Sequence, residues 1–327
     1  MAEVTSLRKA KNEVWITGVL EEKNIEIKPV EFTNKISGIK QTTDQISGTL
    51  TINVNGNKIK VSMRANALKT DGNPNGLYAG YKTVKEEYVS RAEAIARGDE
   101  NLATIIKVKG ELNPYDAVDK RTFEIYTPMY IKGTYFNRGE ITDTHRATFV
   151  TEIFIESVAP EQVDGKETGR TVVEGILPLY GGVVEPVRFV AGEEEKGNVG
   201  KFILENYEAG KTYQVRGDIK SVITHKDYTK EGMFGTETTT FESIKTEFVL
   251  NSSSDVKAIL ITDPRSYDKN TIKAAMLHRQ EKNDARIAKE RANADSGNIP
   301  PAFTSFASPF AGKVETMTEQ EINEIEF

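Results

Sequence analysis

Apolar and polar residues alternate along much of this chain with the two-residue period of half-buried β-strands. The alternation is clearest in residues 46–54 and 58–65, which flank the pair Asn55-Gly56. An Asn-Gly pair between two such segments is typical of a hairpin with a two-residue loop, because both loop positions adopt positive φ. The pattern predicts a mainly β chain with one hairpin centred on this pair.

Helical periodicity is confined to three segments. The first, 83–98, ends at Gly98 and has one apolar face, made of Val84, Tyr88, Ala92 and Ile95. A shorter segment, 197–210, also ends at a glycine. The third, 268–296, begins at Asp268 as a plausible N-cap and has few apolar positions, so we expect a charged helix that is solvated or weakly docked.

Three sequence patterns occur twice in the same order, which indicates two copies of one unit. The shared features are a glycine at one offset (Gly18 and Gly175), a Val-basic-Gly-acid run around Gly110 and Gly217, and a Thr-Glu pair before a last apolar strand. We interpret the pairs as the first, fourth and fifth strands of each unit. The matched segments are 14–20 with 171–177, 104–112 with 211–219, and 149–155 with 243–250.

Each copy therefore has strands, a helix, a fourth strand, a variable loop and a fifth strand. This order resembles the OB-fold, a five-stranded Greek-key barrel in which a first-strand glycine suits the sharp bend. The expected fold is mainly β, with two OB-like Greek-key barrels in tandem, each with one helix, followed by a helix and a disordered acidic tail. The expected domains are 8–160 (first barrel with a strand and helix insertion), 168–262 (second barrel), 268–296 (charged helix) and 297–327 (linker and tail).

The composition excludes several classes of protein. The chain has no cysteine, so it holds neither a disulfide framework nor a thiolate zinc site, and it fits a reducing compartment. Its first fifteen residues lack an apolar core, so we expect no signal peptide, and no run of about 18 apolar residues predicts a membrane span. We expect a cytoplasmic protein, in the host cytoplasm if a phage encodes it.

The net charge of −6 at first argues against a nucleic-acid partner. Residues 314–327, however, hold five acidic residues and no Lys or Arg. Without them the chain has 43 basic and 44 acidic residues, a net of about −1. A neutral body of this kind can carry a basic groove.

No catalytic constellation can be assembled from these residues. His145, His225 and His278 stand in unrelated sequence contexts. Neither of the two common glycine-rich phosphate-binding motifs, GxxxxGK(S/T) and GxGxxG, occurs in the chain. Carboxylate pairs such as Glu152 and Glu156 are expected by chance among 49 acidic residues. We therefore expect no enzyme, no metal site and no cofactor.

Aromatic and basic residues interleave in the two loops that precede the fifth strands, as a surface for single-stranded nucleic acid requires. These aromatics can instead belong to a barrel core, because aromatic residues are enriched in any strand. Trp15, beside Ile16, is assigned to the core. The candidate DNA-binding residues are Arg64, Tyr115, Lys120, Arg121, Tyr126, Lys132, Tyr135, Arg188, Lys226, Tyr228, Lys230 and Phe234.

The chain ends in EINEIEF, which is either a frayed terminus or a peptide that docks into a partner through Ile325 and Phe327. Two OB-like units, a Pro-containing linker and this ending together resemble single-stranded DNA-binding proteins of the replication type, particularly those of bacteria and phages. In that family an acidic tail ending in Ile-Pro-Phe or similar docks replication and repair enzymes. The matching positions are Glu324, Ile325, Glu326 and Phe327, with Glu326 in place of the usual proline.

The resemblance implies single-stranded DNA as one partner and replication or recombination proteins, such as a polymerase, helicase or primase, as tail partners. The tandem layout favours a phage origin. The first functional hypothesis is a non-enzymatic protein that coats single-stranded DNA and recruits partners through its tail. The alternative is a phage structural or assembly protein with OB barrels as protein-docking modules, and a variant that binds RNA or anneals strands also stays open.

Overall fold

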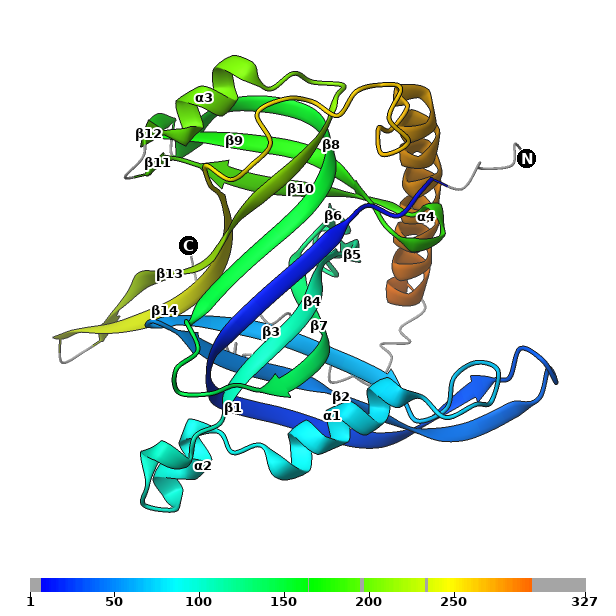
Figure 1. The fold of residues 1–327 in the computed structure, drawn as a ribbon, viewed down its shortest axis with the longest axis vertical. Coiled ribbons are helices and arrows are strands. Elements are labelled where there is room, and N and C mark those ends of the chain that lie inside the picture. The colour runs from blue at the N-terminus through cyan, green and yellow to red at the C-terminus, as the bar shows by residue number, and fades with distance from the viewer. Residues whose placement is uncertain (1–6, 164, 195–196, 233–234, 296–327) are drawn as a thin grey trace. The chain divides into compact units, whose positions relative to one another are not determined.

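The computed structural model describes residues 7–163, 165–194, 197–232 and 235–295, without the side chains of 223–244. The chain divides into two units, one of residues 1–221 with 246–298 and one of residues 222–245 with 299–327. The described part of the second unit consists of segments of two strands. As the sequence predicts, the protein is mainly β, and its long strands form one ten-stranded mixed sheet (Figure 1).

Five strands of the first unit close into a ring in the order β1-β2-β3-β7-β4 and back to β1. All neighbours are antiparallel except β3 and β7, which are parallel. The ring encloses apolar side chains that alternate along each strand, such as Leu50, Ile59 and Val61, and these are fully buried. Its strands are β1 (Asn12–Thr33), β2 (Lys40–Val54), β3 (Asn57–Asn66), β4 (Ile105–Pro114) and β7 (Met129–Arg138).

The hairpin predicted at Asn55-Gly56 is confirmed. Val54 at the end of β2 pairs with Asn57 at the start of β3. Asn55 has φ 52° and Gly56 has φ 90°, so both loop residues adopt the left-handed conformation that this turn requires. The turn fixes the register of β2 against β3, and this register places Arg64 opposite Ser47.

The connection from β3 to β4 contains two helices, where the sequence pattern predicts one over 83–98. They are α1 (Gly76–Glu87) and α2 (Arg91–Ala96), followed by the 3-10 turn η1 (Glu100–Leu102). The break has a local cause, because Ser90 and Glu93 form a capping box that starts a new helix. The predicted apolar face is therefore wrong at its end, and Ile95 is 54% exposed.

A second ring has the order β8-β9-β10-β14-β13 and back to β8, with β10 and β14 parallel. The helix α3 (Val199–Asn206), predicted within 197–210, lies between β10 and β13 in the chain. The strands are β8 (Arg146–Val163), β9 (Lys166–Pro178), β10 (Val184–Ala191), β13 (Thr212–Gly232) and β14 (Gly235–Leu250). Shorter elements are β5 (Ala117–Val118), β6 (Ile125–Tyr126), η2 (Tyr180–Gly182), β11 (Glu193–Glu194) and β12 (Gly197–Asn198).

The strand assignment from sequence is wrong in two places. Residues 149–155 belong to β8, the first strand of the second ring, whereas the fifth strand of the first ring is β7. Residues 171–177 accordingly lie in β9, a second strand rather than a first. The error arose because Gly18 and Gly175 share a backbone constraint: a Cβ at either position would lie 2.4 or 2.7 Å from a neighbouring carbonyl oxygen.

The sequence match between 104–112 and 211–219, interpreted as two fourth strands, agrees with the structure. Gly110 on β4 and Gly217 on β13 occupy equivalent fourth strands. At both positions an added Cβ would lie within 2.3 Å of a carbonyl oxygen on the adjacent strand, so only glycine fits. The predicted boundary at 160–168 coincides with the turn from β8 to β9, and the division into domains itself stays a prediction.

The two rings share one sheet because β1 pairs with β8 in antiparallel register from Asn12↔Thr151 to Thr17↔Arg146. Figure 1 shows β1 (blue) beside β8 (green). We call this line of pairing the seam. On its two sides β1 continues to β4 and β8 continues to β13, so the four strands β4, β1, β8 and β13 form one continuous surface.

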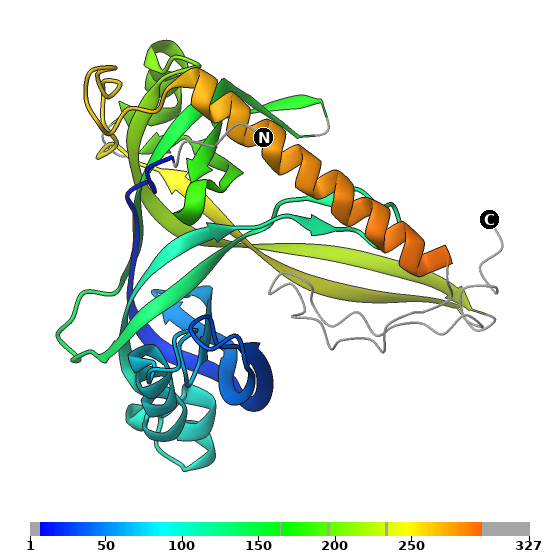
Figure 2. The same ribbon diagram turned by 90° about the vertical axis from the view of Figure 1, so that its right-hand side faces the viewer.

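The charged helix predicted at 268–296 is present as α4 (Lys269–Asp295), a single long helix (Figure 2). Asp268 caps it by accepting a hydrogen bond from the Thr271 amide at 2.8 Å. The expectation of a solvated or weakly docked helix is wrong for its first half, because Ile272 and Ala275 are buried and Asn283 is only 6% exposed. The second half of α4 contacts the loop between β4 and β7 mainly through polar and charged side chains rather than through a long apolar stripe.

Candidate nucleic-acid interface

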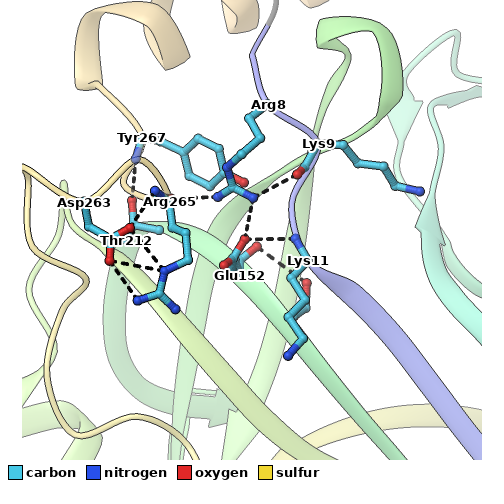
Figure 3. A network of polar contacts seen from close by, with 9 residues as sticks. Arg8, Lys9, Lys11, Glu152, Thr212, Asp263, Arg265 and Tyr267 are labelled. Carbon is cyan, nitrogen blue, oxygen red and sulfur yellow. Dashed lines mark hydrogen bonds and ion pairs between the residues drawn. The ribbon is translucent and has the colours of Figure 1, made fainter.

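A buried carboxylate fixes the start of β1 against the second ring. Glu152 of β8 is almost fully buried, accepts a hydrogen bond from the Lys11 amide at 2.9 Å and forms an ion pair with Arg8 at 2.9 Å (Figure 3). Arg8 also donates to the carbonyl of Arg265 at 2.8 Å and lies 5.0 Å over the ring of Tyr267. Because a buried charge needs such partners, this network sets where β1 enters the sheet.

Cross-strand pairing then places Trp15 at the centre of the outer surface. Trp15 on β1 pairs with Lys109 on β4 and with Thr148 on β8. On the far side of β4, Lys109 pairs with Tyr135 of β7. Directly opposite residues in a sheet project to the same face, so these four side chains form one row.

A second row runs parallel to the first. Thr17 on β1 pairs with Lys107 on β4 and Arg146 on β8, and Lys107 also pairs with Asn137 on β7. The two rows are two residues apart along each strand and therefore share a face. We call this surface the Trp15 face; its members are Trp15, Thr17, Lys107, Lys109, Tyr135, Asn137, Arg146 and Thr148.

Two depressions flank Trp15. The first lies on the side of the first ring and is lined by Lys107, Lys109, Asn137 and Asp143 among others. The second lies across the seam and is lined by Lys11, Thr148 and Arg216 among others. Trp15 and Arg146 line both depressions, so they stand between them. Trp15 is half-buried and Tyr135 is 58% exposed, which leaves ring surface open to a ligand.

The charges of the Trp15 face are only partly compensated within the protein. Lys107 forms an ion pair with Asp143 at 2.8 Å, and Lys109 forms one with Glu13 at 3.1 Å. The hydrogen bond from the Glu140 amide and, after it, that from Lys107 hold the pKa of Asp143 below its usual range. Among the described residues, no carboxylate forms an ion pair with Arg146.

Of the residues predicted from sequence, Tyr135 joins the Trp15 face. Arg64 is exposed on β3, as expected from the predicted third strand. Lys132 on β7 forms an ion pair with Glu111 at 3.5 Å. Tyr115 is half-buried and packs edge-on against Tyr130 with ring centroids 5.4 Å apart, which reduces the ring surface that it can offer.

The loop between β4 and β7 places Lys120 and Arg121 at an exposed turn, and Tyr126 is 47% exposed on β6. The helix α4 holds this loop in place. Arg279 and Asn283 of α4 donate hydrogen bonds to Asp116, whose side chain is almost fully buried. Arg291 lies 5.6 Å over the ring of Phe123, the one residue of the turn with positive φ.

Arg279 also links the first ring to the second, because its Nε donates to Glu185 of β10 at 3.0 Å. Burial acts to raise the pKa of Asp116, but hydrogen bonds from Asn283, Arg279 and Thr127 outweigh it and hold the pKa below its usual range. Burial and the nearby charge of Asp116 raise the pKa of Glu185 to about 7. One guanidinium thus serves two buried carboxylates, one from each ring.

In the second ring, Arg188 on β10 donates to Glu161 at 3.1 Å. Glu161 is 3% exposed and also accepts from Arg170 at 2.6 Å, so Arg188 is paired with a buried carboxylate although its own side chain is 46% exposed. Lys226, Tyr228 and Lys230 lie on β13, with side chains outside the described residues. Phe234 and the tail positions Glu324, Ile325, Glu326 and Phe327 also lie outside the described residues.

The sequence reasoning missed Trp15 and its basic neighbours. The assignment of Trp15 to the core is wrong, because Val14 and Ile16 on either side of it are the buried residues. The alternation of residue types could have shown this. Residues two apart on a strand share a face, so Trp15 projects with Glu13 and Thr17 and away from Val14 and Ile16. The contribution of Lys107, Lys109 and Arg146 depends on long-range pairing and has no local signal.

In the described part of the chain, no group of three or more His, Cys, Asp or Glu side chains has the arrangement of a metal site. Among the described residues, no helix is both long and apolar enough to cross a membrane. The aromatic and cationic groups of the Trp15 face are of the kinds that suit stacking and phosphate contact.

Comparison with known proteins gives a family but little else. Among solved structures, the wild-type single-stranded DNA binding protein from Thermus aquaticus aligns with a TM-score of 0.42 at 9% identity, covering 78% of this chain and 97% of that one. A deletion mutant of the same protein also has a TM-score of 0.42, at 10% identity over 79% of this chain and 100% of that one. A Replication Protein A heterotrimer bound to ssDNA aligns at 0.20, with 10% identity over 72% of this chain and 49% of that one.

Because these TM-scores are all below 0.5, no functional argument is drawn from the three structures. No protein in the curated set that was compared matches this chain. The YorF family matches residues 11–289, which is most of the chain and includes both rings and most of α4. The chain belongs to the YorF family.

Proposed function

We propose that this protein is a non-enzymatic binder of single-stranded DNA that holds the strand on the Trp15 face. The observation that carries the proposal is the row Tyr135, Lys109, Trp15 on three adjacent strands, with Lys107 and Arg146 in the next row. Every base has a π face and every nucleotide a phosphate, so alternating aromatic and cationic groups bind a strand without reading its sequence.

The geometry favours a single strand over a duplex. Stacking on Trp15 or Tyr135 needs a base whose face is free, and bases in a duplex are stacked on one another. Adjacent strands of a sheet are about 4.8 Å apart, so Tyr135 and Trp15, two strands apart, are separated by roughly 10 Å. This spacing suits two separate bases of one extended strand.

We further propose that both rings are OB barrels, the first formed by β1, β2, β3, β4 and β7 and the second beginning at β8. The supporting observation is their common order, in which the third strand is parallel to the fifth and a helix precedes the fourth. In this arrangement the domain division lies between β7 and β8 rather than at 160–168. The protein would coat DNA in the cytoplasm during replication or recombination.

The remaining candidate residues extend this proposal. Arg64, Lys120, Arg121 and Tyr126 lie on exposed parts of the first ring and its loop. Lys226, Tyr228, Lys230 and Phe234 contribute a second group of aromatic and basic residues by sequence. The acidic segment 314–327 serves as a recruitment peptide for a polymerase, helicase or primase, with Ile325 and Phe327 as anchors.

The test is fluorescence anisotropy of a labelled oligo-dT of about 30 nucleotides, compared with a duplex of equal length across a salt series. Tight binding to oligo-dT, weak binding to the duplex and a log–log salt slope of roughly −0.7 per phosphate contact support the proposal. An absence of binding to both at low salt contradicts it and favours rings that dock proteins instead. A preference for oligo-U would reassign the ligand to RNA.

A further inference from the structure

The second depression differs from the first in its charges. The first includes the carboxylate of Asp143, whereas the described lining of the second is cationic, neutral polar or apolar. Its cationic side chains are Lys11, which directly precedes β1, Arg146 from β8 and Arg216 from β13. Hydroxyl groups come from Thr148 and Ser253. This set of donors is suited to a phosphate group.

The three cations come from both sides of the seam. Arg216 pairs with Val150 on β8, and Arg146 lies four residues before Val150 on the same strand and face. At 3.2–3.4 Å per residue Arg146 lies roughly 13 Å from Val150 along β8, and with the strand spacing of about 4.8 Å added at right angles the Cα atoms of Arg146 and Arg216 are roughly 14 Å apart. The row of Trp15 and Thr148 lies between them. An aromatic ring thus stands between two cationic groups, one at each end.

The main chain of Arg216 is fixed while its side chain is available. Ser254 accepts from the Arg216 amide at 2.9 Å and donates to the Arg216 carbonyl at 2.8 Å, and the Asn251 amide donates to the same carbonyl at 3.0 Å. Among the described residues, no carboxylate forms an ion pair with the Arg216 or Lys11 side chain. Asp218, opposite Thr148, instead accepts from Asn251 at 3.3 Å.

We infer that one DNA strand crosses the seam, with a base on Trp15 and a backbone phosphodiester in the second depression at Arg216 and Lys11. The inference rests on the proposed function and extends it, because it assigns both rings to the same strand. The strand passes from the first ring over β1 and β8 to β13. The Arg8–Glu152 network at one end of the seam keeps Lys11 and Trp15 in register with β8.

The experiment measures oligo-dT affinity across a salt series for the full chain and for Arg216→Ala. The matched control is Arg97→Ala, an exposed arginine beyond α2 that lines neither depression. We expect Arg216→Ala to bind more weakly, with a slope shallower by roughly 0.7, because one phosphate contact is lost. Arg97→Ala keeps the affinity and slope of the parent chain, and Arg216→Lys, which keeps the charge, largely restores the slope.

The outcomes separate the two proposals. If the parent chain binds oligo-dT and Arg216→Ala, folded by circular dichroism, binds with the same affinity and slope, the strand stays on the first ring and the inference is wrong. If the parent chain does not bind oligo-dT, the proposed function itself is wrong. Lys11→Ala repeats the measurement at the second cation, and loss of slope in both variants supports the crossing.

Discussion

Trp15 and Lys109 lie directly opposite each other on the antiparallel strands β1 and β4, so an indole ring and an ammonium group share one outer face. Lys109 is half-exposed and its ion pair with Glu13 spans 3.1 Å. An ion pair at such a surface contributes about 0–1 kcal/mol, so a phosphate can replace the carboxylate at little cost. The pair is therefore available for a ligand that offers both a base and a charge.

Replacing Trp15 by alanine is expected to weaken oligo-dT binding by roughly 1–3 kcal/mol, the range for one lost base stack. Trp15→Phe keeps an aromatic face and is expected to retain part of that binding. The control is Tyr180→Ala, because Tyr180 is 84% exposed on η2 and lines neither depression. Equal affinity for Trp15→Ala and the parent chain would place the strand on another surface.

Arg279→Ala is expected to destabilise the protein by about 3–5 kcal/mol, the usual cost of leaving a buried charge without its partner. The variant removes the guanidinium from Asp116 and Glu185, whose side chains are 1% and 10% exposed. Urea denaturation measures the effect. Lys282→Ala, on the exposed side of the same helix, is the control and should change stability by less than about 0.5 kcal/mol; a similarly small change for Arg279→Ala would show that α4 is held by its apolar residues.

The free energy of unfolding should fall as pH rises from about 4.5 to about 7. Burial and the charge of Asp116 raise the pKa of Glu185 from 4.5 to about 7. In this window the folded chain binds a proton at Glu185 that the unfolded chain has released, so each step up in pH favours unfolding. The contribution is complete below pH 4.5 and lost above pH 7.

Urea denaturation at several pH values tests this expectation, with Glu185→Gln as the comparison. The glutamine variant keeps a neutral group of similar shape and should show a flatter pH profile between these limits. Parallel profiles for the two chains would mean that Glu185 does not titrate in this window.

Deletion of residues 318–327 is expected to leave oligo-dT affinity equal or higher. The deleted segment contains four of the five carboxylates of the acidic tip and no Lys or Arg, so it repels phosphates and competes with them for basic groups. Partner recruitment should be lost, as measured by co-purification with a replicative polymerase, helicase or primase. Loss of DNA binding on this deletion would contradict the role assigned to the tail.

The parts of the fold that local chemistry decides could be predicted from the sequence. Asn55-Gly56 predicted its hairpin because two residues with positive φ select that turn. Gly110 and Gly217 identified the two fourth strands, since a close backbone approach excludes any side chain at both positions. Arg64 was placed correctly on β3 by simple alternation.

The parts that depend on pairing between distant strands could not be predicted. β8 has the Thr-Glu pattern of β14 and a suitable apolar period, so nothing local shows that it begins the second ring rather than ending the first. The Trp15 face could not be predicted for the same reason. Lys107 and Arg146 lie opposite Thr17 only because of the registers in which β4 and β8 pair with β1. The Asp116–Arg279–Glu185 cluster joins three elements far apart in the chain and has no sequence pattern at all.

The most direct test uses the fact that Trp15 is the only tryptophan of the chain. Its intrinsic fluorescence therefore reports on the Trp15 face without any label. We predict that unlabelled oligo-dT changes this fluorescence saturably, at the concentrations at which anisotropy shows binding, and that added salt reverses the change. Oligo-dT binding that leaves Trp15 fluorescence unaltered would contradict the central claim that the strand lies on this face.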